Sequence, residues 1–221
     1  MTADRYSTQD SSESAFQPGS RGRVLANSLG IVRVRDMQVA ETRALLDLTD
    51  ALLDEVGVAQ RFSVHELRDW HRRWLGGIYP WAGDYRQVNM GKGGFQFASA
   101  HLIHKLMSAF DRDELAAQSP CDGMDDTRLV AALARTHAEF ILIHPFREGN
   151  GRLARLLNTL MALQAGLPLL DFDGLRGQAK RDYIGAIHAA LGGNYEPMER
   201  VFSQVLRRSR RTATSSSDGR L

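Results

Sequence analysis

The sequence lacks the features that mark disulfide-stabilised, membrane-spanning and nucleic-acid-binding proteins. Cys121 is the one cysteine among 221 residues, which excludes an intrachain disulfide framework and fits a reducing compartment. No apolar run approaches the roughly 20 residues of a membrane-spanning helix. A formal net charge of +2 gives no ground for expecting a nucleic-acid partner. Residues 1–14 are polar without an apolar core, so we expect no Sec signal peptide and a cytoplasmic protein, with an effector secreted by another signal left open.

The composition that is present is that of a soluble globular domain with polar ends. Hydrophobic residues make up 43% of the chain and charged residues 24%, and the length suits one domain with tails. Residues 1–22 and 207–221 are rich in Ser, Gly and charged side chains, so we expect both to be disordered around a folded domain at 23–206. The basic run 207–211 is typical of a solvated helix end.

Apolar residues recur at helical spacing along most of this domain. Ser63 and Glu66 are spaced as a capping box that opens one of the helices. The segments expected to be helical are 36–56, 63–75, 99–110, 126–143, 151–166, 177–191 and 194–205. Short loops separate them, which favours an all-α bundle. The exception is 84–98, where a Gly-rich turn at 91–94 between apolar segments predicts a β-hairpin.

The densest chemistry lies in nine consecutive residues, His144–Arg152, followed by Arg155. They follow one predicted helix and open the next, whose unpaired N–H groups and positive dipole end suit phosphate. His144 is a candidate neutral base, and Glu148 is a hard oxygen ligand suited to Mg²⁺. Phe146 is apolar within a polar loop, so we expect it to anchor the loop in the core.

The phosphate-binding character of this segment comes from glycines and arginines. Gly149 and Gly151 let the backbone turn tightly and approach a ligand. Arg152 and Arg155 are three residues apart, so they share a helix face, and guanidinium groups match phosphate oxygens. Each residue alone has an ordinary structural explanation. The chance that all of these motif residues coincide at any one starting position is on the order of one in a billion, from average amino-acid usage.

These residues resemble the motif of the Fic family, H-x-F-x-[D/E]-G-N-G-R-x-x-R, at every fixed position. Three further stretches resemble the family: Asn27–Ile31, Ile78–Gly83 with Arg86, and Gly192–Met198. The resemblance covers about residues 25–206 and implies a Fic-type all-α bundle with a β-hairpin flap beside the active site.

The resemblance implies that the protein transfers AMP from ATP to a Ser, Thr or Tyr hydroxyl of a target protein. His144 would be the general base, and Glu148 would hold a Mg²⁺ ion that bridges the α- and β-phosphates. The flap would pin the target by strand addition. By matching position the flap comprises Val88, Asn89, Met90, Gly91, Lys92, Gly93, Gly94 and Phe95.

The remaining motif residues are implied to bind the phosphates. Gly149, Asn150 and Gly151 would form an anion hole, and Asn150 would also contact the α-phosphate. Arg152 would bind the β-phosphate and Arg155 the γ-phosphate. A kinase-like branch of the family carries Lys in place of Gly151, so this glycine argues against γ-phosphate transfer.

Several alternatives stay open at this point. Relatives that transfer phosphocholine or UMP use a similar motif, and a non-catalytic nucleotide-binding interaction module is another reading. The intact His144 and Glu148 argue against the non-catalytic module. A metal hydrolase on His137, Glu139 and His144 is disfavoured because the sequence has no H-E-x-x-H pattern.

The family's inhibitory helix, [S/T]-x-x-x-E-[G/N], is not found in this sequence. Glu148 is the only glutamate followed by Gly or Asn, and His144 stands four residues before it. We therefore expect either a separate small antitoxin that supplies the inhibitory glutamate or an unrestrained enzyme. The chain is interpreted as the toxin half of a toxin–antitoxin pair.

Overall fold

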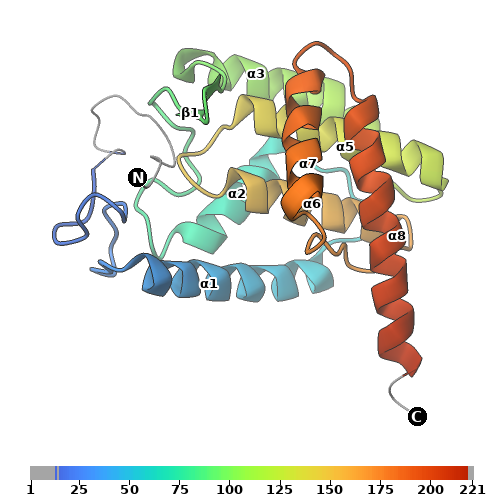
Figure 1. Cartoon of the computed structure of the whole chain (residues 1–221), viewed down its shortest axis with the longest axis horizontal. Helices are drawn as coiled ribbons and strands as arrows, with labels where there is room; N and C mark the ends of the chain where they lie inside the picture. The colour runs from blue at the N-terminus through green and yellow to red at the C-terminus, as the bar shows by residue number, and fades with distance from the viewer. Residues whose placement is uncertain (1–12, 14, 219–221) are drawn as a thin grey trace. The chain divides into compact units, whose positions relative to one another are not determined.

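The computed structural model describes Glu13 and residues 15–218 (Figure 1). Within that part the chain is mostly helical and carries one two-stranded antiparallel sheet, which confirms the all-α fold with a small hairpin. Its contacts divide it into two compact units. The first comprises the described residues up to Glu55, Ser63–Ala109 and Ile143–Leu153, and the second comprises Val56–Phe62, Phe110–Leu142 and the described residues from Ala154 onward.

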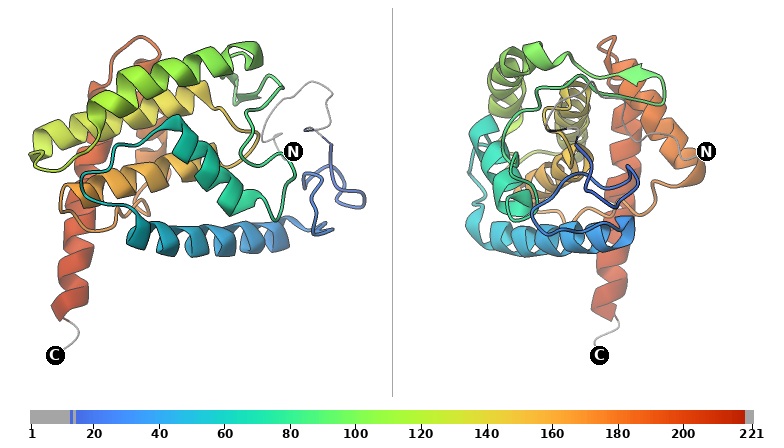
Figure 2. Two further views of the ribbon diagram at one scale, coloured as in Figure 1. Left: turned by 180° about the vertical axis from the view of Figure 1, so that it is seen from behind. Right: turned by 90° about the vertical axis from the view of Figure 1, so that its left-hand side faces the viewer.

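The first unit is built on two helices that pack together, α1 (Val34–Glu55) and α2 (Val64–Leu75) (Figure 2). The capping box at the start of α2 is confirmed. The Ser63 hydroxyl accepts from the Glu66 N–H at 3.3 Å, and the Glu66 carboxylate accepts from the Ser63 N–H at 2.8 Å. These bonds satisfy two N–H groups that the helix itself leaves unpaired. Trp74 and Leu75, near the end of α2, are buried.

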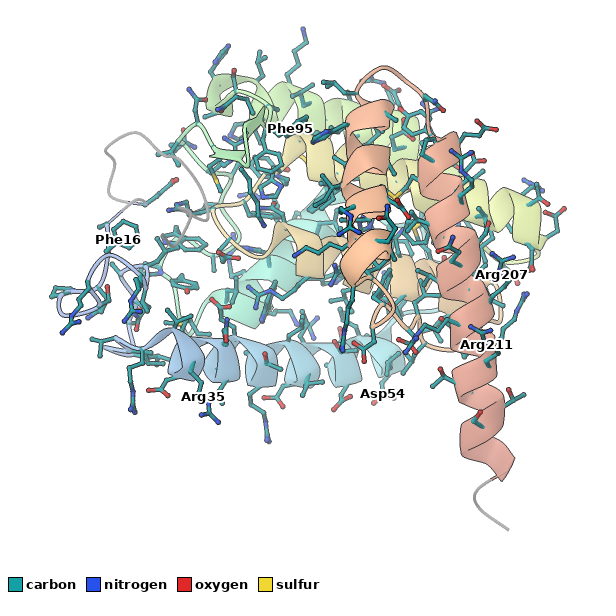
Figure 3. The ribbon with its side chains drawn as sticks, viewed as in Figure 1. Phe16, Arg35, Asp54, Phe95, Arg207 and Arg211 are labelled. Carbon is teal, nitrogen blue, oxygen red and sulfur yellow. The ribbon has the colours of Figure 1, made fainter. Side chains whose placement is uncertain are left out.

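The hairpin of the first unit has two short strands, β1 (Gly91–Lys92) and β2 (Phe95–Gln96). They pair with Gly91 opposite Gln96 and Lys92 opposite Phe95. The two linking residues, Gly93 and Gly94, have φ of +58° and +82°, the conformation that two-residue hairpin turns require. The predicted hairpin is thus confirmed, with shorter strands than the pattern indicated. Figure 3 labels Phe95 on it.

After the hairpin, a 3₁₀ turn η2 (Ala100–Leu102) leads into α3 (Ile103–Phe110). This helix continues into the second unit as a π-helical turn η3 (Asp111–Leu115) and α4 (Ala116–Gln118), neither of which the sequence predicted. The last four helices are α5 (Asp126–Ile143), α6 (Asn150–Gln164), α7 (Gly177–Ala190) and α8 (Glu196–Asp218). In the second unit, α7 and α8 pack along one another (Figure 1).

The structure differs from the two expected tails. Residues 15–22 form part of a turn closed by hydrogen bonds from the Gln17 N–H to the Val24 carbonyl and from the Ala26 N–H to the Ala15 carbonyl. The turn is held because Val24 is buried. The rest of the expected N-terminal tail, residues 1–12 and 14, and the end of the C-terminal one, residues 219–221, lie outside the described residues.

At the other end, α8 continues to Asp218 instead of ending near residue 206. Its apolar stripe continues through Leu206, and Ser209 is buried as well. Arg208 pairs with Asp171 at 2.7 Å and Arg210 with Asp126 at 2.6 Å. The basic run is therefore partly neutralised by acidic partners on the second unit, a long-range pairing that the local sequence does not reveal.

Among the residues that the structure describes, no helix combines the length and apolar character needed to cross a membrane.

Candidate active site

The motif residues 144–149 form the loop between the end of α5 at Ile143 and the start of α6 at Asn150. His144 is almost fully buried, and its backbone has a φ of +52°. Residues other than glycine rarely adopt this left-handed conformation, and it persists only where the surroundings hold it. The candidate base therefore sits at a backbone position that something in the first unit must stabilise.

Arg86 supplies that stabilisation. Its buried guanidinium donates from Nε to the carbonyl of His144 at 2.7 Å and from Nη2 to the carbonyl of Ile143 at 3.3 Å. The same group also donates to the carbonyls of Val88 and Ala98, on either side of the hairpin. Burial lowers the pKa of Arg86 to about 10, so the side chain is still a cation at neutral pH. One side chain thus ties both ends of the flap segment to the backbone of the candidate base.

Replacing Arg86 with alanine is expected to lower the free energy of unfolding by about 3 kcal/mol or more, because several buried carbonyls lose their donor at about 1–3 kcal/mol each. Arg86→Lys keeps the charge but loses the planar fork, so it should recover only part of the loss. Denaturant unfolding measures both variants. Arg43→Ala, which removes an exposed ion pair on α1, is the control and should leave the midpoint unchanged. Arg86→Ala unfolding at the same midpoint as Arg43→Ala would contradict this role.

The ring of His144 stacks on Phe97, with ring centroids 3.8 Å apart and planes 13° from parallel. Phe97 directly follows β2, and its N–H donates to the carbonyl of Met90 at 3.0 Å, which extends the hairpin ladder. The candidate base is therefore in contact with the predicted flap. The sequence predicted the hairpin that includes Phe97, but it did not predict the contact between Phe97 and His144.

Phe146 is fully buried, which confirms it as the anchor of the loop. It stacks on His71, with ring centroids 3.9 Å apart. Nδ1 of His71 accepts from the Gly83 N–H at 2.8 Å, and Nε2 lies 3.1 Å from the Glu148 carbonyl. Burial lowers the pKa of His71 to about 4, so a neutral ring donates from Nε2 to that carbonyl. Nothing in the sequence around His71 marks it as part of the site, yet its ring contacts the motif loop at Phe146 and Glu148.

The loop is closed by the side chain of Asn150. Its Oδ1 accepts from the Phe146 N–H at 2.9 Å, and its Nδ2 donates to the Phe146 carbonyl at 2.7 Å. Gly149 has a φ of +85°, and a Cβ there would lie 2.7 Å from the Trp74 ring, so this position requires glycine. Gly151 has ordinary backbone geometry and open space around it. Its conformation alone does not require glycine, contrary to the tight turn inferred from the sequence.

Two backbone N–H groups at the start of α6, those of Asn150 and Gly151, are suited to bind an anion. Arg152 and Leu153 donate their N–H groups to the Gly149 carbonyl, at 3.0 and 2.9 Å. No acceptor in the described part of the chain receives the N–H of Asn150 or Gly151. Unpaired N–H groups at the positive end of a helix dipole are suited to phosphate oxygens.

Glu148 lies beside these donors. Its carboxylate is nearly buried, and Oε1 accepts from the Gly149 N–H at 3.0 Å and from Nη2 of Arg152 at 3.3 Å. No cluster of three or more His, Cys, Asp or Glu side chains within Glu13 and residues 15–218 could hold a metal ion. A single carboxylate beside a phosphate-binding helix end nevertheless fits Mg²⁺, which binds one or two carboxylates and takes its other ligands from phosphates and water.

Arg155 belongs to the second compact unit, whereas the other predicted site residues belong to the first. Its guanidinium carbon lies 5.5 Å from the centroid of the Phe172 ring. Its Nε is buried without a hydrogen-bond partner, and no ion pair to it occurs in the described part of the chain. This second motif arginine therefore faces no carboxylate of the described residues.

The disfavoured metal site on His137 and Glu139 is not supported by the geometry. His137 is buried between Asn158 at 2.7 Å and the Tyr183 hydroxyl at 2.8 Å. Burial lowers the pKa of His137 to about 4, so it is a neutral packing residue. Glu139 accepts a short hydrogen bond from the Tyr195 hydroxyl.

Comparison with known proteins places these features in a family context. A sequence model described as the Fic/DOC family matches residues 61–162. The chain is 29% identical over 152 residues to a probable protein adenylyltransferase Fic of Escherichia coli, covering 69% of this chain and 73% of that protein. It is also 29% identical over 158 residues to a protein adenylyltransferase Fic of Nematostella vectensis, covering 68% of this chain. The chain spans about a third, 34%, of the length of that relative.

The same fold is found among solved structures. The crystal structure of BepC, a VirB-translocated effector protein of Bartonella tribocorum with bound AMPPNP, aligns with a TM-score of 0.66 at 21% identity. The alignment covers 83% of this chain and 92% of that chain. At this level of identity the match establishes the fold.

Proposed function

The chain belongs to the Fic/DOC family, and we propose that it is a protein adenylyltransferase that transfers AMP from ATP to a hydroxyl of a target protein. The observation that carries the proposal is the motif loop. It holds His144 against the flap and places Glu148 next to the unpaired N–H groups of Asn150 and Gly151. The proposed base, carboxylate and anion-binding backbone thus share one loop.

The chemistry follows from these positions. The target hydroxyl oxygen attacks the α-phosphorus of ATP, a new P–O bond forms, and the bond to the bridging oxygen of the β-phosphate breaks. His144 takes the hydroxyl proton, and pyrophosphate leaves. The N–H groups at the start of α6 and Arg152 stabilise the negative charge on the phosphates, with Arg155 assigned to the γ-phosphate by its motif position.

Glu148 is the residue of this loop that would hold Mg²⁺. When bound, the ion neutralises phosphate charge and helps orient the nucleotide. The Arg152 guanidinium at 3.3 Å and the Gly149 N–H at 3.0 Å fix the orientation of the carboxylate, so it is in place for a cation that arrives with ATP.

The hairpin is proposed to bind the target protein. Its two strands are short and pair with each other, so an extended target segment could add to an edge of this sheet through main-chain hydrogen bonds. The contact between Phe97 and His144 then sets the distance between such a segment and the base. The partners proposed are therefore ATP and a protein with an accessible Ser, Thr or Tyr hydroxyl.

The transferred group is the decisive measurement. Incubation of the purified chain with a bacterial lysate, ATP and Mg²⁺ should add one adenylyl group to a target, seen by intact-mass and peptide mass spectrometry, and should release pyrophosphate. The nucleotide bound to BepC is consistent with an ATP donor. A phosphate-sized addition, or a phosphocholine or UMP addition from the corresponding donors, would replace this assignment. No addition with any donor would favour a nucleotide-binding interaction module.

We further propose that the protein acts in the cytoplasm as the toxin of a toxin–antitoxin pair. Arg155 has no carboxylate partner in the described part of the chain, so an inhibitory glutamate could come from a separate small protein. Production of the chain alone in a bacterial host should then slow growth, and His144→Ala should restore it. Equal growth with both variants would argue against a toxin. If residues after Ser209 inhibited the enzyme instead, a chain that ends at Ser209 would transfer AMP far faster than the full chain.

A further inference from the structure

A buried carboxylate from α1 reaches a motif arginine that lies 111 residues later in the sequence. Glu41 is 4% exposed. Its Oε2 accepts from Nη1 of Arg152 at 2.7 Å, and its Oε1 accepts from the Tyr79 hydroxyl at 2.7 Å. A buried carboxylate is costly unless it is paired and hydrogen-bonded, and here both oxygens have a partner.

The Glu41 side chain is held rigidly. Burial and the nearby Glu41 charge both raise the pKa of Tyr79, so the phenol remains protonated as a donor to the carboxylate. Nε1 of Trp74 donates to the backbone carbonyl of Glu41 at 2.8 Å, which ties α1 to α2 at the same point. The carboxylate therefore has a fixed position from which it can orient a cation.

Arg152 is fixed on three sides. Besides Glu41, its Nη2 donates to Oε1 of Glu148 at 3.3 Å, and its guanidinium carbon lies 4.6 Å from the centroid of the Trp74 ring. These two hydrogen bonds use two of the five N–H donors of a guanidinium, and no further hydrogen bond from this guanidinium occurs in the described part of the chain. With 27% of the side chain exposed, donors of Arg152 remain accessible to a ligand.

We propose that Glu41 is a positioning residue that orients Arg152 to bind the β-phosphate of ATP. The inference rests on the proposed function, because that function assigns Arg152 to the phosphates. Arginine has a flexible side chain whose ordering costs conformational entropy, and an arginine that is already oriented has lost that freedom before ATP arrives. The Glu41 carboxylate would also repel a phosphate. Its hydrogen bond to Tyr79 holds it in place, and the Arg152 guanidinium would lie between it and the β-phosphate.

The test is the affinity of Glu41→Gln for a series of nucleotides without a target protein. Glutamine is isosteric but uncharged, and its single amide oxygen can take only one of the two acceptor positions that face Tyr79 and Arg152. Competition against a fluorescent ATP analogue should show affinities for ATP and ADP lower by about tenfold or more, the value of a charge-assisted hydrogen bond. The affinity for AMP, which has no β-phosphate, should change less than about twofold.

Two further variants separate positioning from damage to the fold. Glu114→Gln makes the same change in a buried glutamate that pairs with Arg135 at 2.6 Å in the second unit. It should leave the affinities for ATP and ADP at the wild-type values. Combining Glu41→Gln with Arg152→Ala should weaken ADP binding no further than Arg152→Ala alone, because both changes remove the same interaction.

Three results would overturn the inference. Unchanged ADP affinity in Glu41→Gln would mean that Arg152 needs no such partner. Tighter binding of ADP would mean that Glu41 weakens nucleotide binding. Equal losses for AMP and ADP, together with additivity in the double variant, would mean that Glu41 only supports the fold. Failure of the proposed function would be seen differently, as a wild-type chain that binds ATP but transfers no AMP. The nucleotide affinities of the variants can still be compared in that case.

Discussion

His144→Ala is expected to lower the rate of AMP transfer by about 10²–10⁴-fold, the usual loss for a general base. The affinity for ATP should stay within about twofold of wild type, because the base acts on the incoming hydroxyl and not on the nucleotide. Single-turnover transfer to an identified target and equilibrium ATP binding measure the two quantities separately.

The left-handed backbone of His144 calls for a second variant. His144→Asn removes the base but keeps a residue type that tolerates a φ of +52° better than most. Both variants should be equally inactive, and His144→Asn should unfold at a midpoint close to that of wild type. A loss of ATP affinity as large as the loss of rate would instead assign His144 to the nucleotide site.

Glu148→Gln is expected to lower the transfer rate by about 10²-fold or more, since it removes the charge that would hold Mg²⁺ against the phosphates. The amide oxygen of glutamine can still accept from the Gly149 N–H, so the loop should keep its shape. The rate should be measured over a range of Mg²⁺ concentrations. Raising the concentration should restore part of the activity of the variant and none of the activity of His144→Ala.

Removal of the ion from the wild-type chain provides the complementary control. Chelation with EDTA should reduce its rate to about the level of Glu148→Gln, while the unfolding midpoint stays the same, because no described cluster of side chains forms a structural metal site. Full activity in EDTA would show that Glu148 serves the loop and not a metal ion.

The contact between Glu41 and Arg152 differs from the inhibitory contact that the family resemblance implies. The resemblance to the family implies that an inhibitory glutamate would pair with the second motif arginine, Arg155. In the structure a carboxylate of the chain itself, Glu41, pairs with the first one, Arg152. Its anchoring by Tyr79 favours a permanent positioning role, which leaves the proposal of a separate antitoxin unaffected.

The sequence alone determined the elements whose causes are local. Apolar residues at helical spacing located the seven expected helices to within a few residues, apart from the longer α8, and Ser63 with Glu66 located the capped start of α2. The paired glycines located the hairpin. Residues 144–155 predicted a motif for phosphate chemistry because they are contiguous, so their types and spacing were visible without a fold.

Only the tertiary structure decided what holds that motif in place. Arg86 binds carbonyls on both sides of the hairpin and at His144, His71 binds the loop at Glu148, and Glu41 binds Arg152 across 111 residues. Arg86 was marked in the sequence by the family resemblance but without a role, whereas the local surroundings of His71 and Glu41 carry no periodicity or spacing that marks them. Their roles arise because burial forces each polar group to find a partner, and the fold alone determines which partner lies within reach.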